Sequence, residues 1–197
     1  MQSTDLNVLL VRHGETQWSL DGRHTSISDI GLTQNGIDQA KMLNGALANK
    51  KFDLVASSPL RRAKDTYLNS GLKDECETWD ELIEWRYGDY EGVTTQEIHS
   101  HNPEWNIFDH GAPGGESPVE ITERADSIIE KIYDSNCSSI CLFSHGHILR
   151  VLAGRWIQEP VQIGKHLVLS TCSISELGFE RTLPAITLWN STNHLRN

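Results

Sequence analysis

The stretch Leu9-Leu10-Val11-Arg12-His13-Gly14-Glu15-Thr16 decides the fold of this chain. Residues 6–11 are apolar apart from one polar residue and too few for a useful helix, which predicts a buried strand. The strand ends in a cation, an imidazole and a glycine, which allows a sharp backbone turn. Ligands of open parallel sheets bind beyond the carboxyl ends of the strands. Arg12 and His13 therefore stand where a binding site is expected.

A second run repeats this plan near the other end of the chain. Residues 139–147 read Ser-Ile-Cys-Leu-Phe-Ser-His-Gly-His, an apolar strand followed by His145 and Gly146. A single histidine in such a place could simply cap a strand beside a polar loop. Two matching strand ends favour a shared site, in which His13 and His145 face each other across one pocket.

The composition is that of an ordinary globular chain with an acidic balance. Its 197 residues fit one domain spanning residues 1–197, large enough to bury a proper core. Seventeen basic against 27 acidic residues give a net charge of −10, which argues against non-specific binding to nucleic acid or to anionic membranes. An anionic substrate must then find a local basic pocket. The sequence makes no prediction of the oligomeric state.

Compartment and membrane signals are few. The cysteines form no Cys-x-x-Cys pair, the first residues lack the basic segment of a signal peptide, and no stretch is long enough to span a bilayer. We therefore expect a reduced, cytoplasmic protein without membrane contact.

Strand and helix signals alternate along the chain. Thr33 and the Ser117-Pro118-x-Glu120 capping box mark two helix starts, and Ser58 with Pro59 is predicted to start a third. The pattern predicts an α/β fold, a three-layer α/β/α arrangement around a mostly parallel sheet. Further strands are expected at 52–56, 172–179 and 185–189, helices at 33–49, 95–101, 118 onward and 148–157, and loops at 17–31 and 105–116. The apolar face of the helix at 33–49 is expected to be Ile37, Ala40, Leu43 and Leu47.

Arg12-His13-Gly14 after an N-terminal strand, with the later Ser144-His145-Gly146, resembles the histidine phosphatase superfamily. This superfamily includes the cofactor-dependent phosphoglycerate mutases. The resemblance runs from about residue 8 to about residue 153. It implies a phosphoglycerate mutase-like fold, a small phosphorylated substrate and a phosphohistidine intermediate at His13.

Hydrolysis of a phosphate monoester needs a nucleophile, neutralisation of the phosphoryl oxygens and a proton for the leaving alkoxide. His13 is the predicted nucleophile. A neutral imidazole can attack phosphorus through one nitrogen if the other donates its proton to a fixed acceptor, commonly a backbone carbonyl.

Arg12 and Arg62 are predicted to hold the phosphate, because a guanidinium is planar, always charged and able to bind two oxygens. Arg62 is preferred to Arg61 because the family's helix carries an arginine directly before an alanine, as in Arg62-Ala63. His145 is the predicted third ligand, protonated when phosphate is bound, and Gly146 joins it.

Three further positions follow from the resemblance. Ser19 and Thr25 lie in a loop where relatives bring polar phosphate contacts, although a turn-forming role explains them equally well. Glu84 is the predicted general acid and base, in the setting Glu84-x-x-Tyr87-Gly88. Its apolar sequence neighbours would favour the neutral carboxylic acid if the side chain points inward.

His145-x-His147, with His13 nearby, offers an alternative metal site. His147 need not point the same way as His145 in a turn, and no nearby acidic residue completes a known ligand set. We therefore expect neither a metal nor another cofactor. The role of His147 stays open.

The segments 84–92 and 105–116 resemble the sedoheptulose-1,7-bisphosphatase branch of the superfamily, which implies a small sugar phosphate. Trp85, Tyr87 and Trp105 could close over a sugar ring, and core packing explains them nearly as well. A phosphoglycerate mutase is the alternative enzyme, but only about two dozen residues separate Gly92 from Ser117, too few for its usual insertion. A non-catalytic phospholigand-binding module on the same fold is the alternative from another class, although such proteins lose part of the catalytic set.

Overall fold

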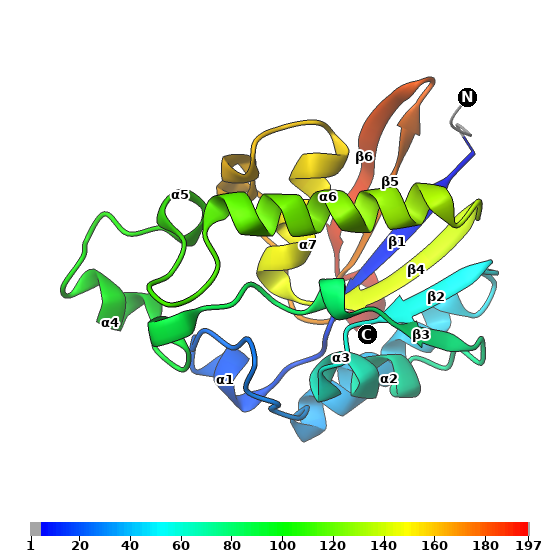
Figure 1. Ribbon diagram of the computed structural model, residues 1–197. Helices are drawn as coiled ribbons and strands as arrows, with labels where there is room; N and C mark the ends of the chain where they lie inside the picture. Colours follow the sequence, from blue (N-terminus) through cyan, green and yellow to red (C-terminus); the bar gives the residue numbers. More distant parts are fainter. Residues whose placement is uncertain (1–4, 197) are drawn as a thin grey trace.

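The computed structural model describes residues 5–196 and contains one six-stranded sheet in the order β3-β2-β4-β1-β5-β6 (Figure 1). Neighbouring strands among the first four of this order pair in parallel. The last two are antiparallel to their neighbours. The prediction of a mostly parallel sheet is therefore confirmed. The strands are β1 (Asn7–Arg12), β2 (Leu54–Ser57), β3 (Cys76–Thr78), β4 (Ser139–Ser144), β5 (Ile174–Glu180) and β6 (Leu183–Ser191).

The pairing of β1 with β4 places the two histidine turns side by side. The strands run in parallel with Arg12 opposite Ser144, so His13 and His145 both leave the sheet at its carboxyl edge. The imidazole centroids lie 5.2 Å apart. The predicted juxtaposition is correct, and it follows directly from the strand register.

Helices cover both faces of the sheet. Figure 1 shows α6 (Pro118–Asp134) and α7 (Gly146–Trp156) on one side, and α2 (Gln34–Leu47) and α3 (Arg61–Asn69) on the other. Alternate side chains of β1 enter the two cores: Val8 and Leu10 pack in the cluster that includes α6 and α7, Leu9 and Val11 in the cluster that includes α2. Both faces are thus buried, as expected for the central strand of a three-layer fold.

Shorter elements complete the chain. The loops expected at 17–31 and 105–116 each contain one turn of helix, and the expected short helix near 95 is present. These are α1 (Gln17–Leu20), α5 (Ile107–His110) and α4 (Thr95–His99), with 3₁₀ turns η1 (Asp80–Leu82), η2 (Gly88–Tyr90), η3 (Val161–His166) and η4 (Asn193–Leu195). Strand β3 was not predicted, because three mostly exposed residues carry no periodic signal.

One local prediction is wrong, and one holds for three of its four residues. Helix α3 begins at Arg61 with Leu60 as its N-cap, so Ser58 lies before the cap. The Ser58 hydroxyl accepts from the N–H of Leu60 at 3.3 Å and lies 2.8 Å from Nε2 of His145. In α2 the buried positions are Gly36, Ala40, Leu43 and Leu47, while Ile37 is only half-buried.

Glycine at positions 14 and 36 allows the start of α2 to pack directly on the turn that follows β1. A Cβ on Gly14 would lie 2.6 Å from the carbonyl oxygen of Gly36, and a Cβ on Gly36 would lie 2.2 Å from the carbonyl oxygen of Glu15. The N–H of Gly14 also donates to Oγ1 of Thr66 in α3 at 2.9 Å. Helices α2 and α3 therefore both contact the turn that carries His13 and fix its position.

Candidate active site

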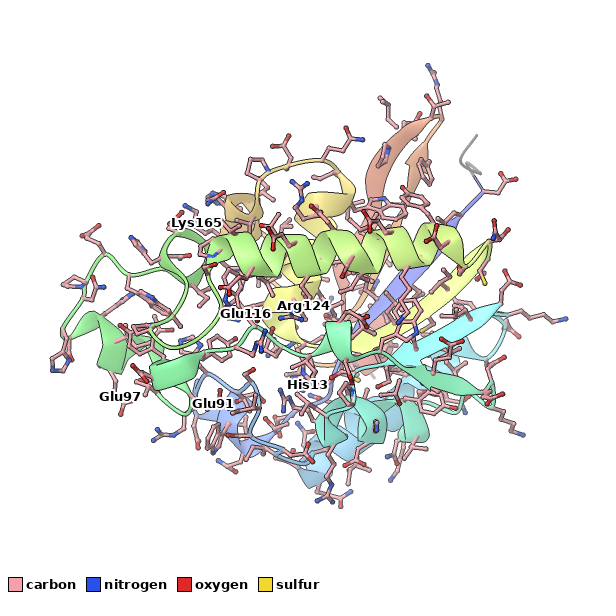
Figure 2. All side chains as sticks on the ribbon, viewed as in Figure 1. His13, Glu91, Glu97, Glu116, Arg124 and Lys165 are labelled. Carbon is pink, nitrogen blue, oxygen red and sulfur yellow. The ribbon has the colours of Figure 1, made fainter. Side chains whose placement is uncertain are left out.

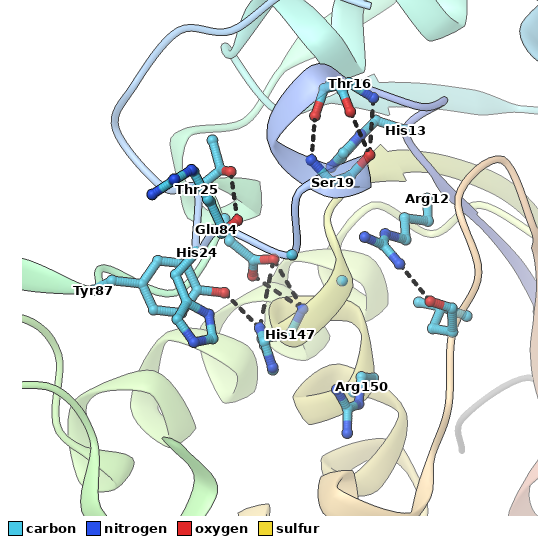
Figure 3. Close-up of a pocket in the computed structure, with 14 residues that line it drawn as sticks. Arg12, His13, Thr16, Ser19, His24, Thr25, Glu84, Tyr87, His147 and Arg150 are labelled. Carbon is cyan, nitrogen blue, oxygen red and sulfur yellow. Dashed lines mark hydrogen bonds and ion pairs between the residues drawn. The ribbon is translucent and has the colours of Figure 1, made fainter. Parts of the chain in front are cut away.

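A cavity of about 200 Å³ opens at the carboxyl edge of the sheet (Figure 3). It collects residues from the ends of β1 and β4, from the loop around α1 and from the segment that precedes η2. Its lining includes six of the predicted site residues: Arg12, His13, Ser19, Thr25, Glu84 and Gly146. Two predicted residues, Arg62 and His145, lie in the layer directly behind the cavity wall.

His13 has the geometry of a nitrogen nucleophile. Its Nδ1 lies 2.8 Å from the carbonyl oxygen of Gly14, which can only accept, so Nδ1 carries the proton and donates it. Burial, together with the charges of Arg62 and Arg12, lowers the pKa of His13 well below 6.5. The ring is therefore neutral at pH 7, and the lone pair of Nε2 is left available.

Arg12 supplies positive charge to the same cavity. Its Nη1 donates to the carbonyl oxygen of Leu169, but its buried Nε has no hydrogen-bond partner within residues 5–196. An unpaired buried donor costs free energy, and it is accounted for if an anion accepts from it. Gly146 leaves room for this, because a Cβ there would lie 3.4 Å from Nε of Arg12.

Arg62 and His145 form a fully buried pair beneath His13. Nε of Arg62 donates to Nδ1 of His145 at 3.1 Å, and the rest of the guanidinium donates to the carbonyl oxygens of Thr25, Ser26 and Ser28. Since Nδ1 of His145 accepts, its Nε2 carries the proton toward Ser58. Burial and the charge of Arg62 lower the pKa of His145 well below 6.5. Protonation of His145 when phosphate is bound stays a prediction.

Ser19 and Thr25 line the cavity with hydroxyls that are already engaged. Ser19 forms a reciprocal capping box with Thr16 at the start of α1, and Thr25 donates to the carbonyl oxygen of Arg23 at 3.0 Å (Figure 3). Their observed contacts are those of turn-forming residues, and a phosphate contact by either stays a prediction.

Glu84 points inward, and its side chain is 6% exposed. Its surroundings are polar, in contrast to the expectation of an apolar pocket. The oxygens accept from the backbone N–H groups of Trp85, His147 and Ile148 at 2.9–3.1 Å. Two of these groups belong to the first turn of α7, where they have no partner within the helix. These bonds hold the Glu84 side chain in one position at the cavity, beside Gly146.

The position of the Glu84 segment depends on a buried ion pair that the sequence did not indicate. Arg124 of α6 donates to the carbonyl oxygens of Glu81, Ile83 and Glu84, and its guanidinium contacts Glu116 at 2.7 Å (Figure 2). Glu116 also accepts from the N–H of Arg86 at 2.8 Å. Both side chains therefore bind the main chain on either side of Glu84.

A cluster of rings forms the outer wall of the cavity. Oη of Tyr87 lies 2.5 Å from Nδ1 of His147, and the ring of His24 lies 4.7 Å from that of Tyr87. Arg150 follows on the next turn of α7. His24 and Arg150 were given no role from the sequence, because single residues of these types carry no spacing signal. His147 was weighed only as part of a His-x-His metal site, and its ring does line the cavity.

Within residues 5–196, no group of three or more histidine, cysteine, aspartate or glutamate side chains is placed to hold a metal ion. In the same part of the chain, no helix combines the length and apolar character that crossing a membrane requires.

Comparison with known proteins agrees with this geometry. The family model of the histidine phosphatase superfamily (branch 1) matches residues 8–192. The chain belongs to this superfamily. It is 39% identical over 190 residues to an acid phosphatase of Mycobacterium tuberculosis, covering 95% of this chain and 93% of that protein. It is 32% identical to the sedoheptulose 1,7-bisphosphatase of Saccharomyces cerevisiae, covering 82% of this chain and 71% of the relative.

A solved structure supports the same assignment. The product of an open reading frame from Mycobacterium tuberculosis superimposes with a TM-score of 0.90 at 37% identity, over 96% of this chain and 99% of the other. The phosphoglycerate mutase-like fold is thereby confirmed. This histidine phosphatase is a phosphoric monoester hydrolase.

Proposed function

We propose that this histidine phosphatase hydrolyses small sugar phosphates through a phosphohistidine formed on Nε2 of His13. The observation that carries the proposal is the hydrogen bond from Nδ1 to the carbonyl oxygen of Gly14, together with the lowered pKa of the ring. It leaves a neutral imidazole with its lone pair at the cavity, which is the form that can attack phosphorus.

The phosphoryl oxygens meet positive charge and unpaired donors. Nε of Arg12 has no partner in the described residues, and the N–H of Gly146, the first of α7, is likewise without one there. Arg62 and His145 add charge and a polar ring behind His13, and they bind phosphate by exchanging one of their present hydrogen bonds. The donors of Arg12 and Gly146 are in place before the phosphoryl group arrives, which favours electrostatic stabilisation of the transferring group.

Glu84 handles the protons of both steps. In the first, Nε2 of His13 forms the bond to phosphorus while the P–O bond to the sugar breaks, and protonated Glu84 gives its proton to the leaving oxygen. In the second, the Glu84 carboxylate takes a proton from water, whose oxygen displaces Nε2 and releases inorganic phosphate. The carboxylate returns to its protonated form, so the cycle is balanced.

The sugar part of the proposal rests on the resemblance to the sedoheptulose 1,7-bisphosphatase relative and on the outer ring cluster. Of the aromatic residues that could close over a sugar, Tyr87 lines the main cavity and Trp105 a neighbouring one. Trp85 does not, because it is fully buried against Phe108 and donates to the carbonyl oxygen of Glu116. Core packing explains that residue.

A screen of sugar phosphates, phosphoglycerates and p-nitrophenyl phosphate tests the proposal by release of inorganic phosphate. We expect sugar phosphates to be turned over much faster than either phosphoglycerate. Samples quenched in alkali during turnover should carry phosphate label on His13 only transiently. Interconversion of phosphoglycerates as fast as phosphate release would identify a mutase instead. Binding of these esters without turnover would identify a non-catalytic module.

A further inference from the structure

A second cavity of about 130 Å³ adjoins the first and shares three wall residues with it: His24, His147 and Arg150. Its remaining wall comes from α4, α5 and the residues between them. Rings form much of the lining, and no aspartate or glutamate among the described residues belongs to it. On a chain with a net charge of −10, a cavity that contains an arginine and no carboxylate is selective for negative charge.

The hydrogen bond between Tyr87 and His147 has a fixed direction. Burial raises the pKa of Tyr87 well above 10.0 and lowers the pKa of His147 well below 6.5, so both side chains are neutral at pH 7. Tyr87 then donates from Oη to Nδ1 of His147, at 2.5 Å. A neutral imidazole that accepts at Nδ1 carries its proton on Nε2. His147 thus offers an N–H donor from a ring that lines both cavities.

Arg150 is held so that part of its guanidinium stays available. Its Cζ lies 4.6 Å above the ring of Phe108, and its Nε and Nη2 donate to the carbonyl oxygens of Gly164 and Lys165 at 2.8 and 3.4 Å. Nη1 has no hydrogen-bond partner in residues 5–196 and is not buried. No carboxylate of the described residues forms an ion pair with Arg150. The guanidinium is therefore a preorganised cation that forms no ion pair in that part of the chain, although the charge of Glu84 acts on it from the first cavity.

We propose that the second cavity binds an anionic group, a phosphate or a carboxylate, at the far end of the alcohol that leaves when His13 takes the phosphoryl group, with Arg150 and His147 as donors. This inference rests on the proposed function, and it narrows the substrate to molecules with two anionic groups. One leaving alcohol can extend from Glu84 in the first cavity to His147 in the second. Glu84, which protonates the leaving oxygen, accepts from the backbone N–H of His147, so the two residues are in direct contact.

The test compares pairs of substrates that differ in the second anionic group. Fructose 1,6-bisphosphate is set against fructose 1-phosphate, and 3-phosphoglycerate against glycerol 1-phosphate, with p-nitrophenyl phosphate as a reference. We expect the wild type to prefer the doubly anionic member of at least one pair. Arg150→Met should lower kcat/KM for that member by roughly 10–100-fold, the range for a lost charged hydrogen bond. The loss for the singly anionic member should be clearly smaller, because it places no second anionic group against Arg150.

Arg155→Met is the matched control, because Arg155 lies on the same helix, pairs with Asp126 at 2.8 Å and lines neither cavity. Arg155→Met should leave the preference for the doubly anionic substrate unchanged. Arg150→Lys should retain part of the preference that Arg150→Met loses. Equal losses on both members of a pair, or no preference in the wild type, would overturn the inference while leaving the hydrolase proposal intact. Turnover of p-nitrophenyl phosphate with no turnover of any sugar phosphate would instead refute the sugar assignment, and the glycerate pair would still test Arg150.

Discussion

The two halves of the active site are built in different ways. Arg12 and His13 follow β1, and His145 follows β4, so the ladder of backbone hydrogen bonds between two central strands fixes their separation. Glu84 belongs to an irregular segment between the 3₁₀ turns η1 and η2, and side chains from elsewhere hold it. The nucleophile is therefore positioned mainly by the main chain. The position of the acid depends on a few side chains, and it should be sensitive to their substitution.

The largest expected effect is on the half built by the sheet. His13→Ala should reduce phosphate release by roughly 10⁴-fold or more, because no other group in the cavity replaces the nucleophile. The fold should persist, since His13 lies in neither core cluster. Labelling with a phosphate donor, followed by an alkaline quench in which the P–N bond survives, should show no phosphohistidine. His101→Ala, at an exposed histidine away from both cavities, is the control, and stable label on the His13 variant would exclude His13 as the nucleophile.

Glu84→Gln tests the other half through its dependence on the leaving group. A sugar alkoxide needs a proton as the P–O bond breaks, whereas nitrophenolate hardly does. Phosphorylation of His13 by a sugar phosphate should slow by roughly 10²–10⁴-fold, the range of general acid catalysis. The nitrophenol burst should slow much less. Because Glu84 also acts in dephosphorylation, the burst rate is the quantity to measure, and equal losses for both substrates would indicate a binding or structural role.

Arg124→Met tests whether side chains position the acid. The variant removes the donors to three carbonyl oxygens around Glu84 without touching the cavity. A displacement of about 1 Å costs on the order of 10²-fold in rate, so the sugar phosphate reaction should fall by up to that factor while the nitrophenol burst is less affected. Buried Glu116 would keep only its contacts with Arg86, so the free energy of unfolding should also fall, by less than the roughly 3–5 kcal/mol that a fully unpaired buried charge costs.

Two variants separate rate from stability in that experiment. Arg124→Met combined with Glu116→Gln removes the buried charge that has lost its main partner, and should recover part of the unfolding free energy without recovering the rate. Arg155→Met breaks a comparable pair between α7 and α6 outside the site and should leave the ratio of the two substrates unchanged. If Arg155→Met also changes that ratio, the ratio reports a general loss of stability and not the position of the Glu84 segment.

The same ion pair predicts how stability responds to acid. Burial alone would raise the pKa of Glu116, but hydrogen bonds and charge from Arg124 outweigh it and leave the pKa lowered from 4.5. A lowered pKa means that the folded state favours the carboxylate. Its stabilisation is therefore fully present above about pH 4.5 and is lost as the pH falls through the lowered value. Urea unfolding measures the free energy of unfolding between pH 6 and pH 3. As the pH falls, this free energy should decrease less for Glu116→Gln than for the wild type.

The smallest expected effect is that of chelation. Arg12 and Arg62 supply the positive charge that a metal would bring, so treatment with EDTA should leave the rate unchanged. Loss of activity that a divalent ion restores would revive the His145-x-His147 metal site.

The sequence predicted the half built by the sheet well and the other half only in part. Two apolar runs that end in His-Gly are sufficient to place His13 beside His145 once parallel pairing is assumed. The place of Glu84 came from the resemblance alone. Arg124 and Glu116 gave no signal, because a charged residue on an amphipathic helix and one in a glycine-rich loop both look solvent-exposed in sequence. Ser58 looked like a cap, because its contact with His145 spans 87 positions of the chain.

The contact between Gly14 and Gly36 limits how this protein can change over evolutionary time. The atoms that a side chain would meet at either position are carbonyl oxygens of the main chain, at 2.6 and 2.2 Å. Most steric conflicts can be relieved by a smaller residue at the opposing position, but here neither partner has a side chain to reduce. A substitution at one site therefore has no compensating substitution at the other, and the two positions cannot vary in concert. The turn of the nucleophile is open to change only if α2 itself moves.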